Sequence, residues 1–171
     1  LDWIGIQYYT GRIVRGAEGF QPFLGLPASD GLAPYPKTDS GWNIYPRGLF
    51  DVIAEVAPYG LPIYVTENGV ADAAGGIRPR FVVEHLAALA HALERGYDVR
   101  GYFHWSTIDN FEWQSGFCPR FGLLRVDCAD PMRARTVTEG AAVYSQIIAA
   151  GEVTPAMRAA YPSYAGATPC P

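Results

Sequence analysis

Three short segments of this chain are rich in apolar and aromatic residues, at residues 3–9, 63–66 and 99–105. Each run has the length and the apolar, aromatic or β-branched composition of a strand, and the second is closed by the turn residues Asn68-Gly69. A short strand that is apolar at nearly every position is typical of a sheet covered on both faces. The three runs therefore predict a parallel sheet.

Helical spacing follows the first two runs and recurs near the C-terminal end. Residues 47–57 and 79–95 place leucine, isoleucine and valine three or four positions apart, as on the buried face of a helix. A capping box at Thr136 and Glu139 predicts the start of a last helix, which Gly151 would end. The alternation of strands and helices predicts an α/β fold.

Two architectures fit this alternation equally well, part of a (β/α)8 barrel and an open doubly wound sheet. A barrel of eight units takes about 250 residues, so three units would be a fragment of one. The chain starts inside an apolar strand and without Met, so we expect it to be the C-terminal part of a longer protein. Residues 12–45 form a long connection rich in Gly and Pro, a length typical of functional loops.

Composition and charge narrow the function classes. The chain has 171 residues, 49% of them hydrophobic, and a net charge of −4 with no basic stripe, which argues against nucleic acid as a partner. No apolar run reaches the roughly 20 residues of a membrane span. The cysteines and histidines lack metal-ligand spacing, and no nucleotide-binding loop occurs, so we expect neither a metal nor an organic cofactor. The compartment is left open, with the cytoplasm slightly favoured.

Glu67 is the first candidate for chemistry. It stands where an apolar strand ends, and Gly69 permits a sharp turn just after it. Such a position would aim a carboxylate at the mouth of the sheet, although an exposed glutamate in a loop has the same local sequence. A tyrosine at the end of the first strand could hydrogen-bond this carboxylate. Because side chains alternate along a strand, only one of Tyr8 and Tyr9 can do so.

The loop after the third strand is the second candidate. It carries Trp105, Glu112 and Trp113. Indole rings stack on the apolar face of a pyranose, and a carboxylate accepts hydrogen bonds from neighbouring hydroxyls, so this set suits a sugar. An aromatic plug that closes the end of a sheet would have the same composition.

These segments together resemble the C-terminal portion of glycoside hydrolase family 1, the β-glucosidase and β-glycosidase family. The resemblance covers residues 1–153 in order and favours the barrel, of which the chain would hold about strands six to eight with their helices. Residues 154–171 would be a loosely ordered tail. The segments that carry the resemblance are residues 1–10, residues 41–49, Tyr64-Val65-Thr66-Glu67-Asn68-Gly69, residues 101–113 and residues 120–123.

The resemblance implies a retaining mechanism in which Glu67 is the nucleophile and forms a covalent glycosyl-enzyme. Tyr9 would hydrogen-bond Glu67 and orient it. Gln7 stands where the family usually has an Asn whose amide hydrogen-bonds the sugar and the nucleophile, and the extra methylene of Gln would shift that amide by about 1 Å. The carboxylate of Glu112 would repel a phosphate and so favours a neutral sugar. The residues implied to bind substrate are Gln7, Trp105, Glu112, Trp113 and Phe121.

The family's acid/base carboxyl lies in an Asn-Glu-Pro motif, and this chain contains none. We therefore expect a β-glycosidase, most simply a β-glucosidase acting on β-glycosides or oligosaccharides, whose isolated fragment is inactive. Its necessary partner would be the missing N-terminal part of the same barrel. Two alternatives stay open: a catalytically silent sugar-binding or interaction protein of the same family, and a transglycosidase that uses the same glutamate.

Overall fold

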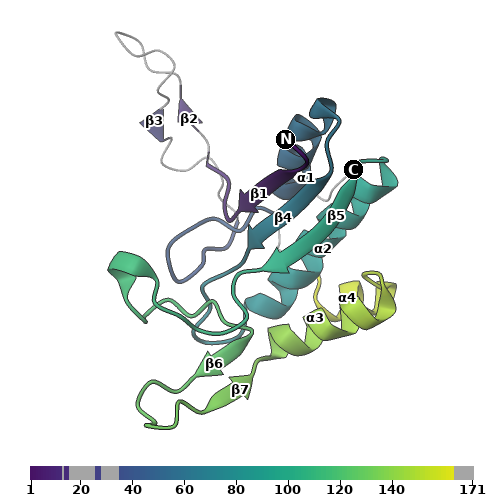
Figure 1. Cartoon of the computed structure of the whole chain (residues 1–171). Helices are drawn as coiled ribbons and strands as arrows, with labels where there is room; N and C mark the ends of the chain where they lie inside the picture. The colour runs from purple at the N-terminus through teal and green to yellow at the C-terminus, as the bar shows by residue number, and fades with distance from the viewer. Residues whose placement is uncertain (13, 16–25, 28–34, 164–171) are drawn as a thin grey trace.

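The computed structural model describes residues 1–12, 14–15, 26–27 and 35–163. Its centre is a parallel three-stranded sheet with the strand order β1-β4-β5, formed by the three predicted runs (Figure 1). Most of the predicted long connection at residues 12–45 lies outside the described residues. The strands of the sheet are β1 (Ile4–Tyr8), β4 (Ile63–Asn68) and β5 (Val99–His104), and a separate antiparallel pair is formed by β2 (Val14–Arg15) and β3 (Leu26–Pro27).

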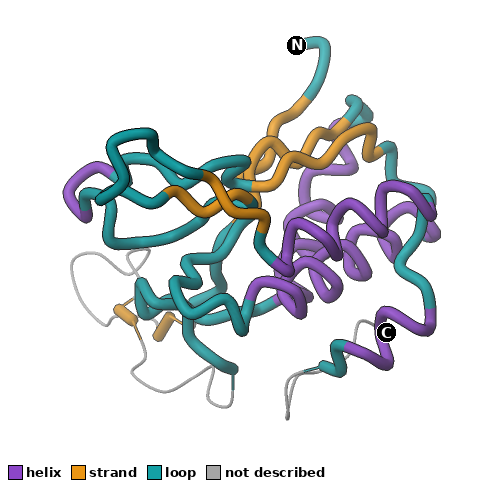
Figure 2. The backbone as a smooth tube through the Cα atoms, turned by 90° about the horizontal axis from the view of Figure 1, so that it is seen from below, coloured by secondary structure: helices purple, strands orange, loops and turns teal. Residues whose placement is uncertain are grey.

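Helices cover one face of the sheet (Figure 2). Helices α1 (Pro46–Val56) and α2 (Arg78–Glu94) each connect one strand to the next parallel strand, and their bounds differ from the predicted ones by one residue. Helix α3 (Glu139–Ala150) packs against α2. The shorter elements are the 3-10 helices η1 (Ala57–Tyr59) and η2 (Trp113–Ser115), helix α4 (Pro155–Ala160), and the antiparallel hairpin of β6 (Leu124–Val126) and β7 (Arg135–Val137).

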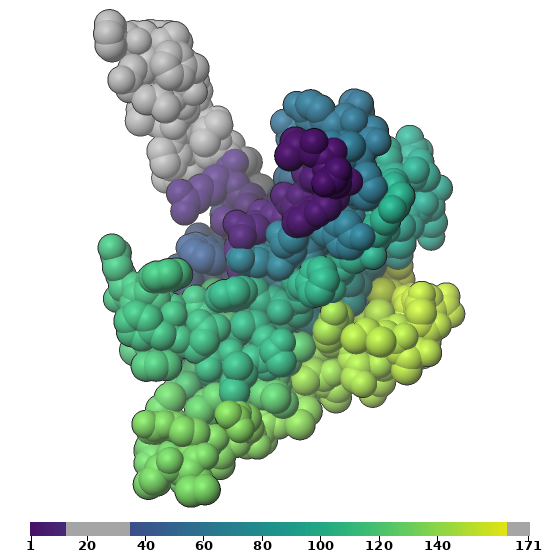
Figure 3. Space-filling view, viewed as in Figure 1, coloured from purple at the N-terminus to yellow at the C-terminus, as the bar shows by residue number. Residues whose placement is uncertain are grey.

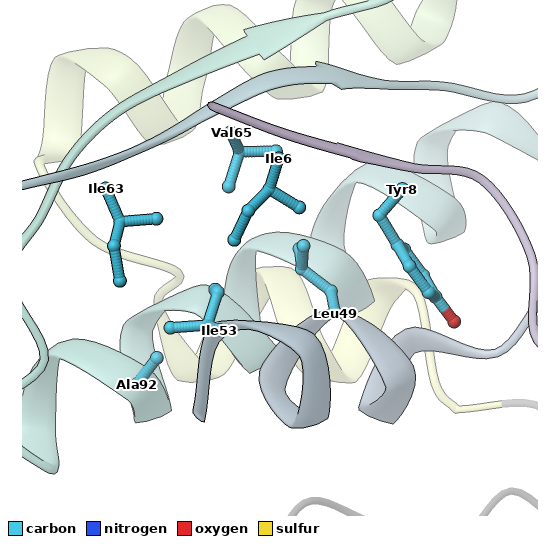
Figure 4. Close-up of a cluster of buried hydrophobic side chains, with 7 residues drawn as sticks. All are labelled: Ile6, Tyr8, Leu49, Ile53, Ile63, Val65 and Ala92. Atoms are coloured by element: carbon cyan, nitrogen blue, oxygen red, sulfur yellow. The ribbon is translucent and has the colours of Figure 1, made fainter. Parts of the chain in front are cut away.

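The main core lies between the sheet and the first two helices (Figure 4). Apolar side chains from alternate positions of β1 and β4 meet Leu49 and Ile53 of α1 and Ala92 of α2, all three fully buried. Burying a side chain of this size contributes about 1.5–3 kcal/mol. This packing fixes which side of each strand faces the helices. The sheet residues of the cluster are Ile6, Tyr8, Ile63 and Val65.

The opposite face of the sheet is open, contrary to the predicted coverage of both faces. Trp3 and Phe103 lie half exposed on it, at 50% and 58%. An open hollow of about 740 Å³ lies over the same face, beside Gly5, Gln7 and Thr66. In a closed barrel this face points inward and packs against side chains from the opposite strands. The described strands form only part of such a barrel.

At the C-terminal end the predicted helix cap was wrong, and the predicted loose tail does not hold for residues 155–160. Thr138, not Thr136, caps α3, because its side chain accepts a hydrogen bond from the amide of Ala141 at 3.2 Å while Thr136 lies in β7. The tail expected to be loosely ordered forms α4, and Met157 and Tyr161 pack against the core between α2 and α3. Residues 164–171 of that tail lie outside the described residues.

Candidate active site

The end of β4 carries a β-bulge that decides where Glu67 points. Val65 pairs with Ile6 of β1, but the next pair is Gln7 with Glu67, so Thr66 is an extra residue in β4. The register against β5 shifts over the same segment. Regular alternation after Val65 would turn Glu67 toward the helices. The bulge instead places Glu67 on the open face with Gln7.

The residue after Glu67 turns the other way and anchors the bulge. Asn68 is fully buried; its Nδ2 donates to the carbonyl oxygen of Tyr8 at 2.7 Å, and its Oδ1 accepts from the hydroxyl of Tyr102 at 2.7 Å. The hydroxyl of Thr66 donates to the carbonyl of Ile6 at 3.1 Å. The end of β4 is therefore tied by side chains to both neighbouring strands.

Gly69 allows the chain to pass very close to the backbone just after β5. A Cβ atom added to it would lie 1.7 Å from the carbonyl oxygen of Trp105. The amide of Trp105 in turn donates to the carbonyl of Asn68 at 2.9 Å. Only glycine fits this contact, which brings the loop after β5 against the segment that holds Glu67.

Each carboxylate oxygen of Glu67 accepts a hydrogen bond from β1 or the residue that follows it. The hydroxyl of Tyr9 donates to Oε2 at 2.6 Å, and Nε2 of Gln7 donates to Oε1 at 2.7 Å. Burial and the hydrogen bond to Glu67 raise the pKa of Tyr9, so its hydroxyl stays protonated as a donor. Tyr8 points to the helix side, where its hydroxyl donates to the carbonyl of Tyr45 at 2.5 Å. Of the two tyrosines in the sequence, Tyr9 is therefore the one that contacts Glu67.

Two aromatic side chains pack against the ring of Tyr9. Its ring lies edge-on to Trp42, with ring centres 5.7 Å apart, and edge-on to Phe121, with centres 6.2 Å apart. Phe121 is buried and also contacts Trp42. The sequence pattern did not assign Trp42 to the site. The only signal would have been an indole in the Gly- and Pro-rich connection shortly before α1.

The loop after β5 brings two further predicted residues together. The indole Nε1 of Trp105 donates to Oε1 of Glu112 at 3.2 Å. Glu112 is near enough to Tyr9 for its charge to contribute to the raised pKa of that hydroxyl, after burial and Glu67. Trp113 is 81% exposed, and the structure does not bring its side chain into the group around Glu67. Its neighbours around a small open hollow are Phe111, Glu112, Gln114 and Ser115.

A polar network braces this loop against the one after β4. Asp109 is buried and accepts from the amide of Gly122 at 2.9 Å and from the guanidinium of Arg120 at 3.2 Å. Arg78, only 1% exposed, donates to the carbonyl of Arg120 at 2.5 Å and to that of Asp72 at 3.2 Å. The loop and the hairpin β6–β7 lie side by side at the end of the molecule to which the strands point (Figure 3).

The described residues contain neither a metal-binding cluster nor a membrane-spanning helix. No cluster of three or more histidine, cysteine, aspartate or glutamate side chains in the described ranges is placed to hold a metal ion. No helix within those ranges has the length and apolar character needed to span a bilayer.

Comparison with known proteins agrees with this geometry. The model for glycosyl hydrolase family 1 matches residues 1–153, and the chain belongs to that family. A β-galactosidase of Sulfolobus acidocaldarius is 49% identical over an alignment of 136 positions that covers 74% of this chain and 27% of the relative. A β-glucosidase of Agrobacterium sp. is 38% identical over an alignment of 162 positions that covers 86% of this chain and 34% of the relative.

Solved structures agree as well. The β-glycosidase from Pyrococcus horikoshii superposes with a TM-score of 0.85 at 37% identity, over 95% of this chain and 38% of that protein. The predicted fold class is thereby confirmed: the three parallel strands and their helices are part of a (β/α)8 barrel. The chain spans about a third of the length of the relatives it matches.

Proposed function

We propose that this chain supplies the nucleophile side of the active site of a retaining β-glycosidase, most simply a β-glucosidase. The observation that carries the proposal is the carboxylate of Glu67, aimed at the open face of the sheet with a donor on each oxygen. A retaining glycosidase uses two carboxyl groups about 5–5.5 Å apart, one ionised and one protonated. In this proposal the protonated partner comes from a part of the barrel outside residues 1–171.

The proposed reaction has two steps. An oxygen of Glu67 bonds to the anomeric carbon while the bond to the leaving group breaks, and the acid carboxyl protonates the departing oxygen. Water then attacks the same carbon, and the carboxylate of Glu67 is released. Tyr9 orients Glu67 throughout. The residues proposed to bind the sugar are Gln7, Trp105, Glu112, Trp113 and Phe121.

The proposed substrate is a neutral β-linked sugar. Glu112 would accept hydrogen bonds from sugar hydroxyls, and its negative charge would repel a phosphate group. The two relatives named above are called a β-galactosidase and a β-glucosidase, which supports a site that accepts both sugars. We further propose that residues 1–153 form the catalytic part and that residues 154–171 lie outside it.

Covalent trapping in the full-length protein tests this function. An activated 2-fluoro-glucoside should inactivate the protein, and mass spectrometry of its peptides should find the added sugar on Glu67. The Glu67→Gln variant should remain unlabelled and should lose turnover of an aryl β-glucoside. A full-length protein that binds the glucoside but neither turns it over nor becomes labelled would favour the silent sugar-binding alternative.

A further inference from the structure

The loop from residue 109 to residue 122 follows β5 and carries Glu112. We infer that Asp109 is the positioning residue of this loop: its buried carboxylate holds the two ends of the loop together and so places the carboxylate of Glu112 for the sugar hydroxyls. This inference rests on the proposed function and deepens it, because it names a residue that sets sugar affinity through another side chain.

Both oxygens of the Asp109 carboxylate accept hydrogen bonds from the far end of the loop and the strand that follows it. Oδ1 accepts from the amide of Gly122 at 2.9 Å. Oδ2 accepts from Nη1 of Arg120 at 3.2 Å and from the amide of Val126 at 3.1 Å. The Asp109 side chain is only 2% exposed, so water does not compete for these bonds. A single side chain thus joins the start of the loop to its end.

The backbone brings the same two ends into contact. The amide of Asp109 donates to the carbonyl of Leu124 at 3.1 Å, and the amide of Leu124 donates to the carbonyl of Thr107 at 2.9 Å. A Cβ atom added to Gly122 would lie 2.3 Å from the amide nitrogen of Asp109. The ends of the loop therefore meet directly at the Asp109 carboxylate.

The tip of the loop is closed by hydrogen bonds within itself. The amide of Glu112 donates to the carbonyl of Gly116 at 2.7 Å, and the amide of Ser115 donates to the carbonyl of Glu112 at 2.9 Å. The indole of Trp105 adds a side-chain contact to Glu112 at 3.2 Å, at the long end of the range for such bonds. Because the tip forms a unit of its own, its position relative to the sheet depends on the base that Asp109 closes.

That base is fixed relative to the strand that ends in Glu67. The carbonyl of Arg120 accepts from the amide of Asp72 at 2.9 Å and from the guanidinium of Arg78, and both donors follow β4 in the chain. The loop that carries Glu112 is thus positioned with reference to the nucleophile strand. A misplacement of about 1 Å at such a distance from the chemistry can lower the rate about a hundredfold.

The change Asp109→Asn breaks one half of this arrangement and keeps the other. Asparagine has the same size, and its Oδ1 can still accept from the amide of Gly122. Its NH2 group would face two other donors, the guanidinium of Arg120 and the amide of Val126, with which it forms no hydrogen bond. The base of the loop should therefore open on that side.

A double-mutant cycle in the full-length protein tests the inference. Asp109→Asn should lower kcat/KM for an aryl β-glucoside roughly ten- to a hundredfold. Most of the loss should be a higher KM, because a hydrogen bond to a hydroxyl that does not react is present in both the bound substrate and the transition state. In the Glu112→Gln background the same change should lower kcat/KM by less than about threefold, because the contact that Asp109 positions is already weakened.

Asp127→Asn is the matched control. Asp127 is an exposed aspartate in the hairpin β6–β7, and it also accepts from two backbone amides, those of Ala129 and Asp130. Its replacement should leave kcat and KM at the wild-type values. Arg120→Met is the second variant for the cycle: it removes one donor from a side chain that is 24% exposed, and it gives the same comparison if Asp109→Asn does not fold.

The cycle distinguishes positioning from a general loss of structure. A purely structural Asp109 would lower kcat/KM by the same factor with and without the Glu112→Gln change. Equal factors in the two backgrounds, or a wild-type kcat/KM in a folded Asp109→Asn protein, would overturn the inference and leave the proposed function intact. A wild-type protein without turnover of the glucoside contradicts the proposed function itself, and this is seen before any variant is compared.

Discussion

Three side chains at the ends of two adjacent strands define the site at the scale of single residues. Glu67 supplies the carboxylate, and Tyr9 and Gln7 each donate to one of its oxygens. A hydrogen bond to a charged group contributes about 1.5–3 kcal/mol, more than one between neutral groups. Loss of either donor should therefore lower the catalytic rate strongly and change the stability of the fold little.

If the proposed function holds, changing Tyr9→Phe in the full-length protein should lower kcat roughly tenfold to a hundredfold, because it removes one charge-assisted hydrogen bond. The ring and its contacts with Trp42 and Phe121 are kept, so the unfolding temperature should change little. Steady-state kinetics with an aryl β-glucoside measure the effect. Tyr59→Phe, at a tyrosine that is 73% exposed in η1, is the matched control. A wild-type kcat in Tyr9→Phe would contradict the orienting role.

At the scale of elements, short contacts between segments set the positions of the site loops. The bulge in β4 is tied to β1 and β5 through Asn68, and Gly69 passes against the carbonyl of Trp105. Helix α3 packs on the outside of α2, and Gly140 at its start lies against the side chain of Arg78. The start of α3 therefore contacts the network that braces the loop after β5.

The cap of α3 provides a test at this scale. Thr138→Ala should lower the stability of the helix by about 1 kcal/mol, because the amide of Ala141 loses its side-chain acceptor. Thr136→Ala is a demanding control, since the sequence pattern had placed the cap there. Thermal unfolding of the two variants of the full-length protein compares them directly. An equal or larger loss in Thr136→Ala would contradict the observed cap.

At the scale of the whole molecule, two histidines are buried where the helices meet the sheet. Burial lowers the pKa of both His85 and His104 to about 3, and the nearby charge of Arg78 contributes for His104. His85 stacks on Phe81 with ring centres 3.8 Å apart. Within the described part of the chain, Nε2 of His85 and both ring nitrogens of His104 have no hydrogen-bond partner. Both rings are thus neutral in the folded protein at neutral pH.

Stability should consequently fall in mild acid. Below pH 6.5 the unfolded chain binds protons at these histidines and the folded chain does not, so the free energy of unfolding decreases as the pH falls from 6.5 toward 3. At pH 5 the loss is about 2 kcal/mol for each histidine. Urea unfolding of the full-length protein at pH 7 and pH 5 measures it. In the His85→Leu variant, the free energy of unfolding should differ less between pH 7 and pH 5. An unchanged difference would contradict a neutral His85 in the folded protein.

The exposed inner face and the two unpaired strand edges of the sheet predict how residues 1–171 behave in isolation. In the described sheet, β1 and β5 each have one neighbour, so both present unpaired backbone groups at an edge. We expect purified residues 1–171 to aggregate readily and to turn over no aryl β-glucoside, because they hold one of the two carboxyl groups. Co-expression with the remaining part of the barrel should restore activity. Appreciable turnover by the isolated fragment would contradict this prediction.

Much of the element order followed from local pattern. Short apolar runs and helical spacing predicted all three strands of the central sheet and the helices α1, α2 and α3, because burial imposes these periods on the sequence itself. The position of Glu67 at a strand end and the motifs around it indicated the family. Strand alternation showed that only one of Tyr8 and Tyr9 could reach it, without deciding which.

Only the tertiary structure decided how these residues meet. The bulge at Thr66 depends on pairing with two other strands, and without it Glu67 would face the helices. The support of Tyr9 by Trp42 joins segments more than thirty residues apart, and the cap at Thr138 depends on where β7 ends. A one-dimensional pattern records which residues are buried or exposed. The partner strand sets the register, and the register determines the direction of the Glu67 side chain.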